Sequence, residues 1–183
     1  RESIQIQIGS IDNVPSTNSF LAINDSNKLI MMLFDEKSRT FSLIMDKFKI
    51  IKSFKLIGSL IIAHNEDENE LIVYDRNSIL ESKSFSFKTA IIKLDNAALD
   101  FYSMSADNKY LAAIENKRFL SLYRVSDSQK IAYVPLHSEP FDMSINNDLI
   151  AFSMMDSRMI SLIIVDPLQL EDHLKKVKSL PSR

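Results

Sequence analysis

The amino-acid sequence predicts an all-β fold made of repeated four-stranded antiparallel units, followed by one C-terminal helix. Short apolar or alternating runs are separated by polar clusters rich in Asn, Asp and Ser, which is typical of strands joined by tight turns. Similar strand and turn segments recur at a spacing of about 40 residues. Hydrophobic residues make up 45% of the 183 residues and charged residues 25%, so the chain has a globular composition.

The polar clusters divide the chain into short strands. The run from Ile4 to Ile8 alternates strictly between Ile and Gln, which is the period of a half-buried strand. The side chains of Asn, Asp and Ser hydrogen-bond the local backbone and tolerate left-handed conformations, so clusters of them favour turns. We expect further strands at residues 20–23, 29–34, 41–45, 59–63, 71–74, 110–114, 119–125, 149–154 and 159–165.

These strands belong to a repeating unit. Residues 21–30, 103–112 and 143–151 each carry a strand end, a turn with Asn or Asp, and an apolar strand. The turn residue Asn108 stands 39 positions before Asn147, its counterpart in the next unit. A unit of about 40 residues with four strands is typical of a blade of a β-propeller.

The repeated pattern resembles WD40-type repeats. In that family the third strand of a blade ends in a Trp-Asp pair. Met45-Asp46, Tyr74-Asp75 and Val165-Asp166 stand in similar places here, and Tyr123-Arg124 replaces the pair once. The Gly-His pair of the family and its glycine-bearing turns are absent. The resemblance covers roughly residues 18–166 and implies a degenerate propeller with a role in protein–protein interaction.

The spacing of the repeats is irregular between residues 47 and 100. Asp46 and Asp75 are only 29 positions apart, whereas Asp75 and Arg124 are 49 apart. This spacing indicates that one blade has lost a strand and that extra residues are inserted before the next blade. We count about four blades in residues 1–166, fewer than the roughly seven common in the propellers that the chain resembles. We therefore expect these blades to form part of a larger propeller.

The last part of the chain, residues 167–183, is predicted to form a helix and tail. Asp166 is a favourable N-cap and Pro167 suits the first helical position. Acidic residues occupy the first turn and lysines the last, which suits the helix dipole. Three apolar residues share one face and form a candidate surface for a neighbouring protein: Leu170, Leu174 and Val177.

Basic and apolar residues interleave between residues 47 and 55. A partner with an acidic surface could bind this segment, and its candidate contact residues are Lys47, Lys49 and Lys52. The same alternation also describes an outer strand with a charged face, since lysine protects sheet edges from aggregation. Residues 82–88, with Phe85 and Phe87 at alternate positions, likewise indicate a half-buried strand.

Few residues in the sequence suit catalysis or ligand binding. There is no cysteine, and Gly9 and Gly58 are too far apart for a phosphate-binding loop. His64, His137 and His173 have no partner at catalytic or metal-binding spacing. Residues 65–70 hold carboxylates without the spacing of a calcium loop, so they form a solvated hairpin tip or an acidic docking spot. We expect no metal, no cofactor and no catalytic residues.

These observations favour a non-enzymatic interaction scaffold or a regulatory propeller segment. The net charge of −2 gives no support for nucleic-acid binding, and no apolar run is long enough to span a membrane. The chain begins at Arg1, and we expect it to be a piece of a longer, intracellular and cytoplasmic protein. Two alternatives remain: an assembly segment that docks through its C-terminal helix, and a propeller-based hydrolase.

Overall fold

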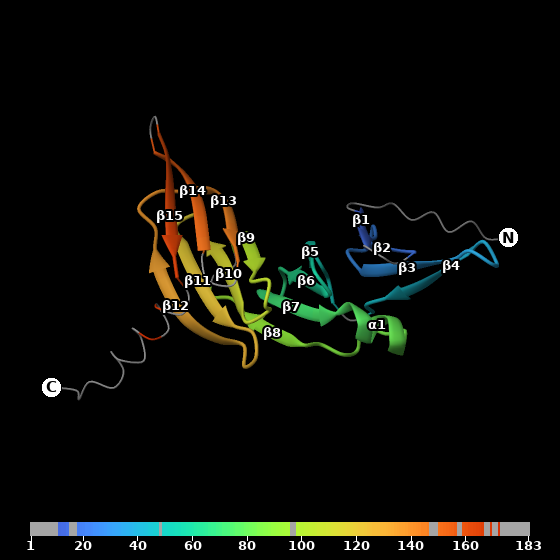
Figure 1. Ribbon diagram of the computed structural model, residues 1–183. Coiled ribbons are helices and arrows are strands. Elements are labelled where there is room, and N and C mark those ends of the chain that lie inside the picture. Colours follow the sequence, from blue (N-terminus) through green and yellow to red (C-terminus); the bar gives the residue numbers. More distant parts are fainter. Residues whose placement is uncertain are drawn as a thin grey trace. The chain divides into compact units, whose positions relative to one another are not determined.

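The computed structural model describes residues 11–14, 18–47, 49–95, 98–146, 150–156 and 159–166, together with Gln169 and Asp172. The chain forms two compact units, residues 1–93 and residues 94–183. Each unit contains two antiparallel sheets, and the elements are labelled in Figure 1. We number the sheets 1 to 4 in chain order.

Unit 1 contains sheets 1 and 2. Sheet 1 consists of β1 (Ile11–Val14), β2 (Ser19–Ile23), β3 (Leu29–Asp35) and β4 (Thr40–Met45). Sheet 2 consists of β5 (Ser53–Ile57), β6 (Leu60–Asn65), β7 (Glu70–Asp75) and β8 (Ala90–Lys93). The helix α1 (Arg76–Ser82) lies between β7 and β8 in the chain.

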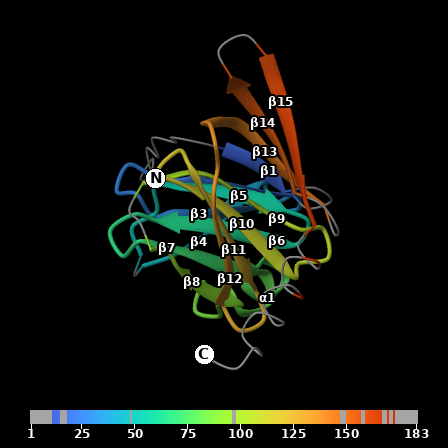
Figure 2. The ribbon, with the colours of Figure 1, turned by 90° about the vertical axis from the view of Figure 1, so that its left-hand side faces the viewer.

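Unit 2 contains sheets 3 and 4. Sheet 3 consists of β9 (Leu99–Met104), β10 (Tyr110–Glu115), β11 (Phe119–Arg124) and β12 (Gln129–Pro135). Sheet 4 consists of β13 (Pro140–Ile145), β14 (Ile150–Asp156) and β15 (Met159–Val165). Figure 2 shows the long hairpin of β14 and β15 from the side.

In every sheet, neighbouring strands follow one another in the sequence and pair antiparallel. This arrangement confirms the all-β class and the repeated sheets of blade-like size. It needs only short connections, and the turn residues explain why these form. Asn27, Asn69, Asn108 and Asn116 all have positive φ angles, between 49° and 61°. Asn tolerates this left-handed conformation better than most residues, as the composition of the turns predicted.

The core of unit 1 lies between sheets 1 and 2. Leu21, Leu29 and Met31 of sheet 1 pack in one buried cluster with Ile61 and Tyr74 of sheet 2. The core of unit 2 forms in the same way between sheets 3 and 4. There, buried residues of β10 and β11 pack against Ile150, Phe152 and Met154 of β14. Each pair of sheets therefore buries apolar faces that neither sheet could bury alone.

A buried hydrogen bond joins the two sheets of unit 1. The hydroxyl of Tyr74 in β7 donates to the carboxylate of Asp46, just after β4, at 2.5 Å. Burial raises the pKa of Tyr74, and the neighbouring Asp46 carboxylate raises it further, so the phenol stays protonated and can donate. The repeat pairs Met45-Asp46 and Tyr74-Asp75 thus contribute one residue each to this contact in the core, Asp46 and Tyr74.

The expected loss of a strand between residues 47 and 100 is wrong. Sheet 2 has four strands, and β5 begins only at Ser53, so residues 49–52 precede the strand instead of forming it. Extra residues are present as α1, but they lie within sheet 2, between β7 and β8, and not before the next sheet as expected. The Asp75 carboxylate accepts hydrogen bonds from the backbone N–H and the hydroxyl of Ser78, which caps the helix.

The predicted strand over residues 82–88 is also wrong. This segment contains the last helical residue, Ser82, and a turn. Lys83 ends the helix in the left-handed conformation at φ 52°. The ring of Phe85 packs edge-on against Tyr74 at 5.4 Å, whereas Phe87 is 64% exposed. Alternation of two Phe residues therefore reflects one core contact and one surface residue, not a pleated strand.

Two predicted elements lie outside the described residues. The first is the strand from Ile4 to Ile8, and the second is the C-terminal helix, apart from Gln169 and Asp172. The cap predicted at the start of that helix is nevertheless visible. The Asp166 carboxylate accepts a hydrogen bond from the backbone N–H of Gln169 at 3.2 Å.

Removal of the Tyr74 hydroxyl should weaken the fold. Tyr74→Phe leaves the buried Asp46 carboxylate without this donor, so the free energy of unfolding should fall by about 1–3 kcal/mol. Urea unfolding followed by circular dichroism measures this change. Tyr133→Phe is the control, because Tyr133 is 44% exposed and its change should stay within about 0.5 kcal/mol. Equal effects of the two substitutions would show that the link is unimportant.

Candidate functional site

The strand β4 ends at Met45-Asp46 and therefore corresponds to β7 and β11, which end at Tyr74-Asp75 and Tyr123-Arg124, but it occupies a different position in its sheet. β7 lies between β6 and β8, and β11 lies between β10 and β12. β4 pairs with β3 alone among the described residues and forms an edge of sheet 1. Five of the six residues of β7 are buried, but in β4 only Ile44 is buried.

The exposed residues of β4 include an apolar stripe that we define as Phe41, Leu43 and Met45. They are 58%, 43% and 42% exposed, respectively. Ile44 joins the core shared with sheet 2, so the alternation of side chains places the apolar stripe on the opposite face of sheet 1. The aromatic ring of Phe41 packs on that of Phe34 in β3, with ring centroids 4.9 Å apart.

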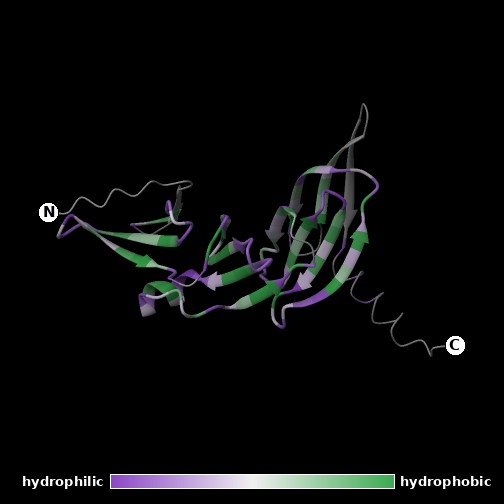
Figure 3. Cartoon of the chain, turned by 180° about the vertical axis from the view of Figure 1, so that it is seen from behind, coloured by the Kyte–Doolittle hydropathy of each residue, from purple (hydrophilic) through white to green (hydrophobic). Residues whose placement is uncertain are grey.

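Corresponding positions in sheet 2 are buried. Met45 stands opposite Ile30 in the ladder, just as Tyr74 stands opposite Ile61. Tyr74 and Ile61 are fully buried in the cluster that sheet 2 shares with sheet 1. The face that sheet 2 packs against its preceding neighbour is therefore, in sheet 1, the face that carries the exposed apolar stripe. Figure 3 shows hydrophobic colouring at the C-terminal end of β4.

The backbone of the apolar stripe also points outward. The N–H of Asp46 donates to the carbonyl of Leu29 at 2.9 Å. In an antiparallel ladder, such hydrogen-bonded pairs alternate with pairs whose backbone groups face away from each other. The residue next to Asp46, Met45, therefore directs its N–H and C=O away from β3, and so do Leu43 and Phe41. These groups are the ones through which another strand would pair.

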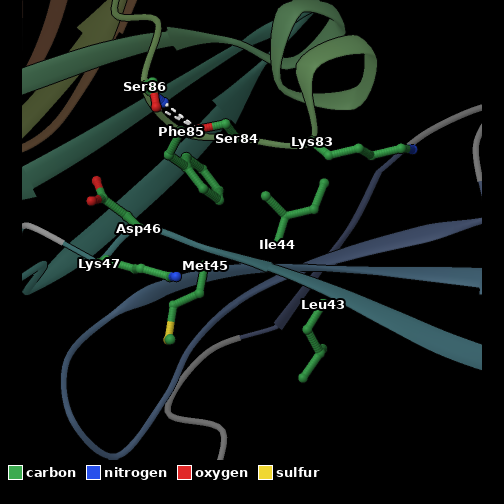
Figure 4. A pocket seen from close by; sticks show the side chains of 9 residues that line it. All are labelled: Leu43, Ile44, Met45, Asp46, Lys47, Lys83, Ser84, Phe85 and Ser86. Atoms are coloured by element: carbon green, nitrogen blue, oxygen red, sulfur yellow. Dashed lines mark hydrogen bonds between the residues drawn. The ribbon is translucent and has the colours of Figure 1, made fainter.

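A pocket of about 420 Å³ lies beside this edge. One wall consists of residues 43–45 of β4 and the following Asp46 and Lys47, and the other wall is residues 83–86. Figure 4 shows Ile44 and Phe85 pointing into the space between these two segments, whereas Leu43 and Met45 point to the other side of β4. The pocket thus lies beside β4, whose counterparts in sheets 2 and 3, β7 and β11, are followed by the outer strands β8 and β12.

The wall formed by residues 83–86 is fixed by local contacts. Lys83 turns the chain at the end of α1, and Phe85 anchors the segment on Tyr74 in the core. The hydroxyl of Ser84 accepts a hydrogen bond from the N–H of Ser86 at 3.1 Å. The insertion that the irregular repeat spacing indicated therefore forms one side of the pocket.

Charged groups at the pocket differ in their partners. Asp46 is buried and accepts the hydrogen bond from Tyr74. Lys47 and Lys83 line the pocket and are exposed. Within the described part of the chain, neither of these two lysines forms an ion pair. The pocket therefore offers two cations that a bound acidic group can reach.

The other two lysines predicted as partner contacts are already engaged. The Nζ atom of Lys49 lies 2.5 Å from a carboxylate oxygen of Glu68 and 3.0 Å from one of Glu70, and Lys52 pairs with Glu66. The hydrogen bond to Glu68 raises the pKa of Lys49. The lysine run and the acidic turn, treated as separate candidates in the sequence, are partners of each other. Of the three predicted lysines, Lys47 alone lines the pocket.

Glu70 is the buried centre of this charged cluster. Burial by itself would raise the pKa of its carboxyl, but hydrogen bonds from Lys93, Lys49 and Asn65 lower it below the usual value of 4.5. The Lys93 Nζ atom lies 2.7 Å from the Glu70 carboxylate. The cluster thus joins the segment before β5 to β7 and β8, which is a structural task.

The remaining sequence candidates are dispersed. Burial lowers the pKa of His64, whose Nε2 atom has no hydrogen-bond partner among the described residues. His137 is exposed, whereas His173 and the apolar residues Leu170, Leu174 and Val177 lie outside the described residues. In the described ranges, no three His, Asp or Glu side chains gather as a metal site would need. No helix described in the structure has the length and apolarity required to cross a membrane.

Comparison with known proteins shows likeness of fold alone. No family model and no curated protein matches the sequence. The computationally designed Ika4 protein is similar in structure, with a TM-score of 0.60 and 8% identity over 90% of this chain and 94% of that one. The designed Ika8 protein has a TM-score of 0.61 and 9% identity, with 86% of this chain and 46% of that chain covered.

A natural protein with a similar structure is dihydro-heme d1 dehydrogenase NirN, solved in complex with DHE. Its TM-score is 0.63 at 12% identity, with 90% of this chain covered, and its fold is propeller-like. The present chain spans 36% of the length of that protein. At this identity the comparison shows likeness of fold alone.

The Glu70 cluster predicts a dependence of stability on pH. Because the pKa of Glu70 is lower in the folded chain, its stabilisation is present above the unfolded pKa and is lost as the pH falls through the folded pKa. Glu70→Gln should therefore lower the free energy of unfolding by about 1–3 kcal/mol at pH 7 and by less in acid. Urea unfolding at pH 7 and pH 3 measures both values.

The exposed Glu81 of α1 provides the control for this measurement. Glu81→Gln should change stability by no more than about 0.5 kcal/mol at either pH. A loss in Glu70→Gln that does not shrink in acid would contradict the role of the ionised carboxylate.

Proposed function

We propose that the chain is a non-enzymatic protein-interaction segment of a larger β-propeller built from degenerate WD40-type repeats, working in the cytoplasm. The succession of antiparallel meander sheets and the likeness to a propeller-like natural protein support this proposal. Its four sheets correspond to successive blades. Such a scaffold positions edges, faces and connecting segments on a rigid framework, and these bind other proteins.

The observation that carries the proposal is the exposed apolar stripe. Phe41, Leu43 and Met45 form an apolar row on one face of sheet 1. The corresponding face of sheet 2 is covered by sheet 1, and the corresponding face of sheet 4 packs against sheet 3. A contiguous exposed apolar surface marks an interaction site because its burial from water is favourable. Sheet 1 thus offers a face suited to a further sheet or to a protein partner.

The buried polar groups support a scaffold role in a different way. The carboxylates of Asp46, Glu70 and Glu115 are each held by side chains of neighbouring strands or connecting segments. Tyr74 binds Asp46, Lys49 and Lys93 bind Glu70, and the Tyr123 hydroxyl donates to Glu115 at 3.2 Å. These groups fix strands and sheets relative to one another, which is the use of buried polar networks in a rigid framework.

Leu43→Glu tests the proposed contact surface. The wild-type chain should self-associate as its concentration rises, because the apolar stripe of one molecule then packs against that of another. Leu43→Glu should shift this association to at least about tenfold higher concentration, since it places a charge in the contact. Light scattering coupled to size exclusion measures the molar mass at each concentration.

Phe141→Glu is the matched control, because Phe141 in β13 has a similar exposure of 46% and lies outside sheet 1. It should leave the association unchanged. A wild-type chain that stays monomeric at millimolar concentration, or equal effects of the two variants, would argue against the proposal. A hydrolase activity abolished by His137→Ala would overturn it in favour of an enzyme.

A further inference from the structure

We infer that the edge of β4 binds an extended peptide segment of a partner protein, which adds to sheet 1 as a further outer strand antiparallel to β4. The partner segment has about six residues, with apolar residues at its centre and acidic residues on either side. This inference rests on the proposed interaction role and specifies the chemistry of the partner. The backbone, the pocket and the charges each support it.

The backbone supplies the hydrogen bonds. The N–H and C=O groups of Phe41, Leu43 and Met45 point away from β3, as the ladder alternation requires. Addition of an extended peptide to such an edge gives a regular ladder in which main-chain hydrogen bonds provide affinity. The edge is also long enough, because β4 has six residues while the outer strands β8 and β12 have four and seven.

Sheets 2 and 3 show how such a strand fits. β8 pairs antiparallel with β7, with Ile91 opposite Ile72 and Ile92 opposite Leu71. β12 pairs in the same way with β11, and its central residues are apolar at successive positions, from Ile131 to Val134. In sheet 1, residues 43–45 of β4 line the pocket of about 420 Å³. A strand added beside β4 would thus lie as β8 lies beside β7 and as β12 lies beside β11.

The apolar surroundings select the centre of the peptide. Side chains of an added strand alternate between the two faces of the sheet. On one face they meet Ile44 and Phe85, and on the other face they meet Leu43 and Met45 of the apolar stripe (Figure 4). Both sets of contacts are apolar, so consecutive apolar residues fit best, as in the centre of β12.

The charges select the flanks of the peptide. Lys47 and Lys83 lie on different sides of the pocket and have no ion-pair partner among the described residues (Figure 4). The neighbouring Lys49 and Lys52 are neutralised by the acidic turn, and the Asp46 carboxylate is bonded to Tyr74. The pocket therefore presents two available cations beside an apolar centre, which complements acidic flanking residues.

A synthetic peptide tests strand addition directly. The probe is a fluorescent, acetylated and amidated peptide of sequence Glu-Ile-Val-Ile-Val-Glu, and fluorescence anisotropy with the full chain measures binding. N-methylation of the alternate amides that face β4 should abolish binding, whereas N-methylation of the other set should preserve it, because only the first set donates to β4. This comparison alters the peptide alone, so it does not depend on the folding of a variant.

Charge reversal tests the flanks. Lys47→Glu combined with Lys83→Glu should weaken binding of the acidic peptide by about tenfold. The same double variant should bind a peptide with lysine at both ends more tightly than the wild-type chain does. Lys88→Glu is the matched control, since Lys88 is exposed and does not line the pocket. Its affinity for the acidic peptide should stay within about twofold of the wild-type value.

The possible results separate this inference from the proposed function. Binding that either set of N-methyl groups abolishes equally, or that neither set affects, would overturn strand addition. Absence of peptide binding, together with self-association sensitive to Leu43→Glu, would overturn the inference and favour a second copy of the chain or a further sheet as the occupant. Absence of both would remove the proposed interaction role as well.

Discussion

The packing of sheet 1 on sheet 2 is the interaction on which the structure of unit 1 depends. A four-stranded sheet with two apolar faces needs a neighbour on each of them, because an uncovered apolar face stays in contact with water. Leu21, Leu29 and Met31 are buried because β6 and β7 lie against them. The hydrogen bond from Tyr74 to Asp46 fixes the same contact at the end of β4. Unit 2 uses the same principle between sheets 3 and 4, so stacking of two sheets organises each unit.

Stacking also explains why the exposed surface of sheet 1 has its composition. A repeated sheet carries an apolar face for each neighbour, and the residues follow the repeat whether or not a neighbour is present. Phe41, Leu43 and Met45 occupy positions of this kind, and in the described chain nothing covers them. The proposed interaction role comes from this uncovered apolar face, and the proposed peptide site comes from the edge of the same sheet at β4.

The sequence predicted the local structure better than the site. Alternating runs and Asn-rich turns located most paired strands of the described chain, because strand period and turn chemistry are local properties. The spacing between Asp75 and Arg124 also indicated an insertion. Lys49 and Lys52 were predicted as partner contacts, but tertiary packing places them beside Glu68 and Glu66. The pocket was not predictable from periodicity, since it depends on which strand ends a sheet and on how Phe85 packs.

The two walls of the pocket differ in how far their length and sequence can change, because one is the strand β4 and the other is the connection that follows the helix α1. The β4 wall belongs to a hydrogen-bonded ladder, so a residue added or removed there shifts the register of Ile44 against the core. The wall after α1 belongs to a connection between β7 and β8 whose length does not enter any ladder. Residues near Lys83 and Ser84 can vary in number and type while the sheets stay the same. The β4 wall thus supplies a constant backbone, whereas substitutions in the wall after α1 can change which peptide sequences are bound.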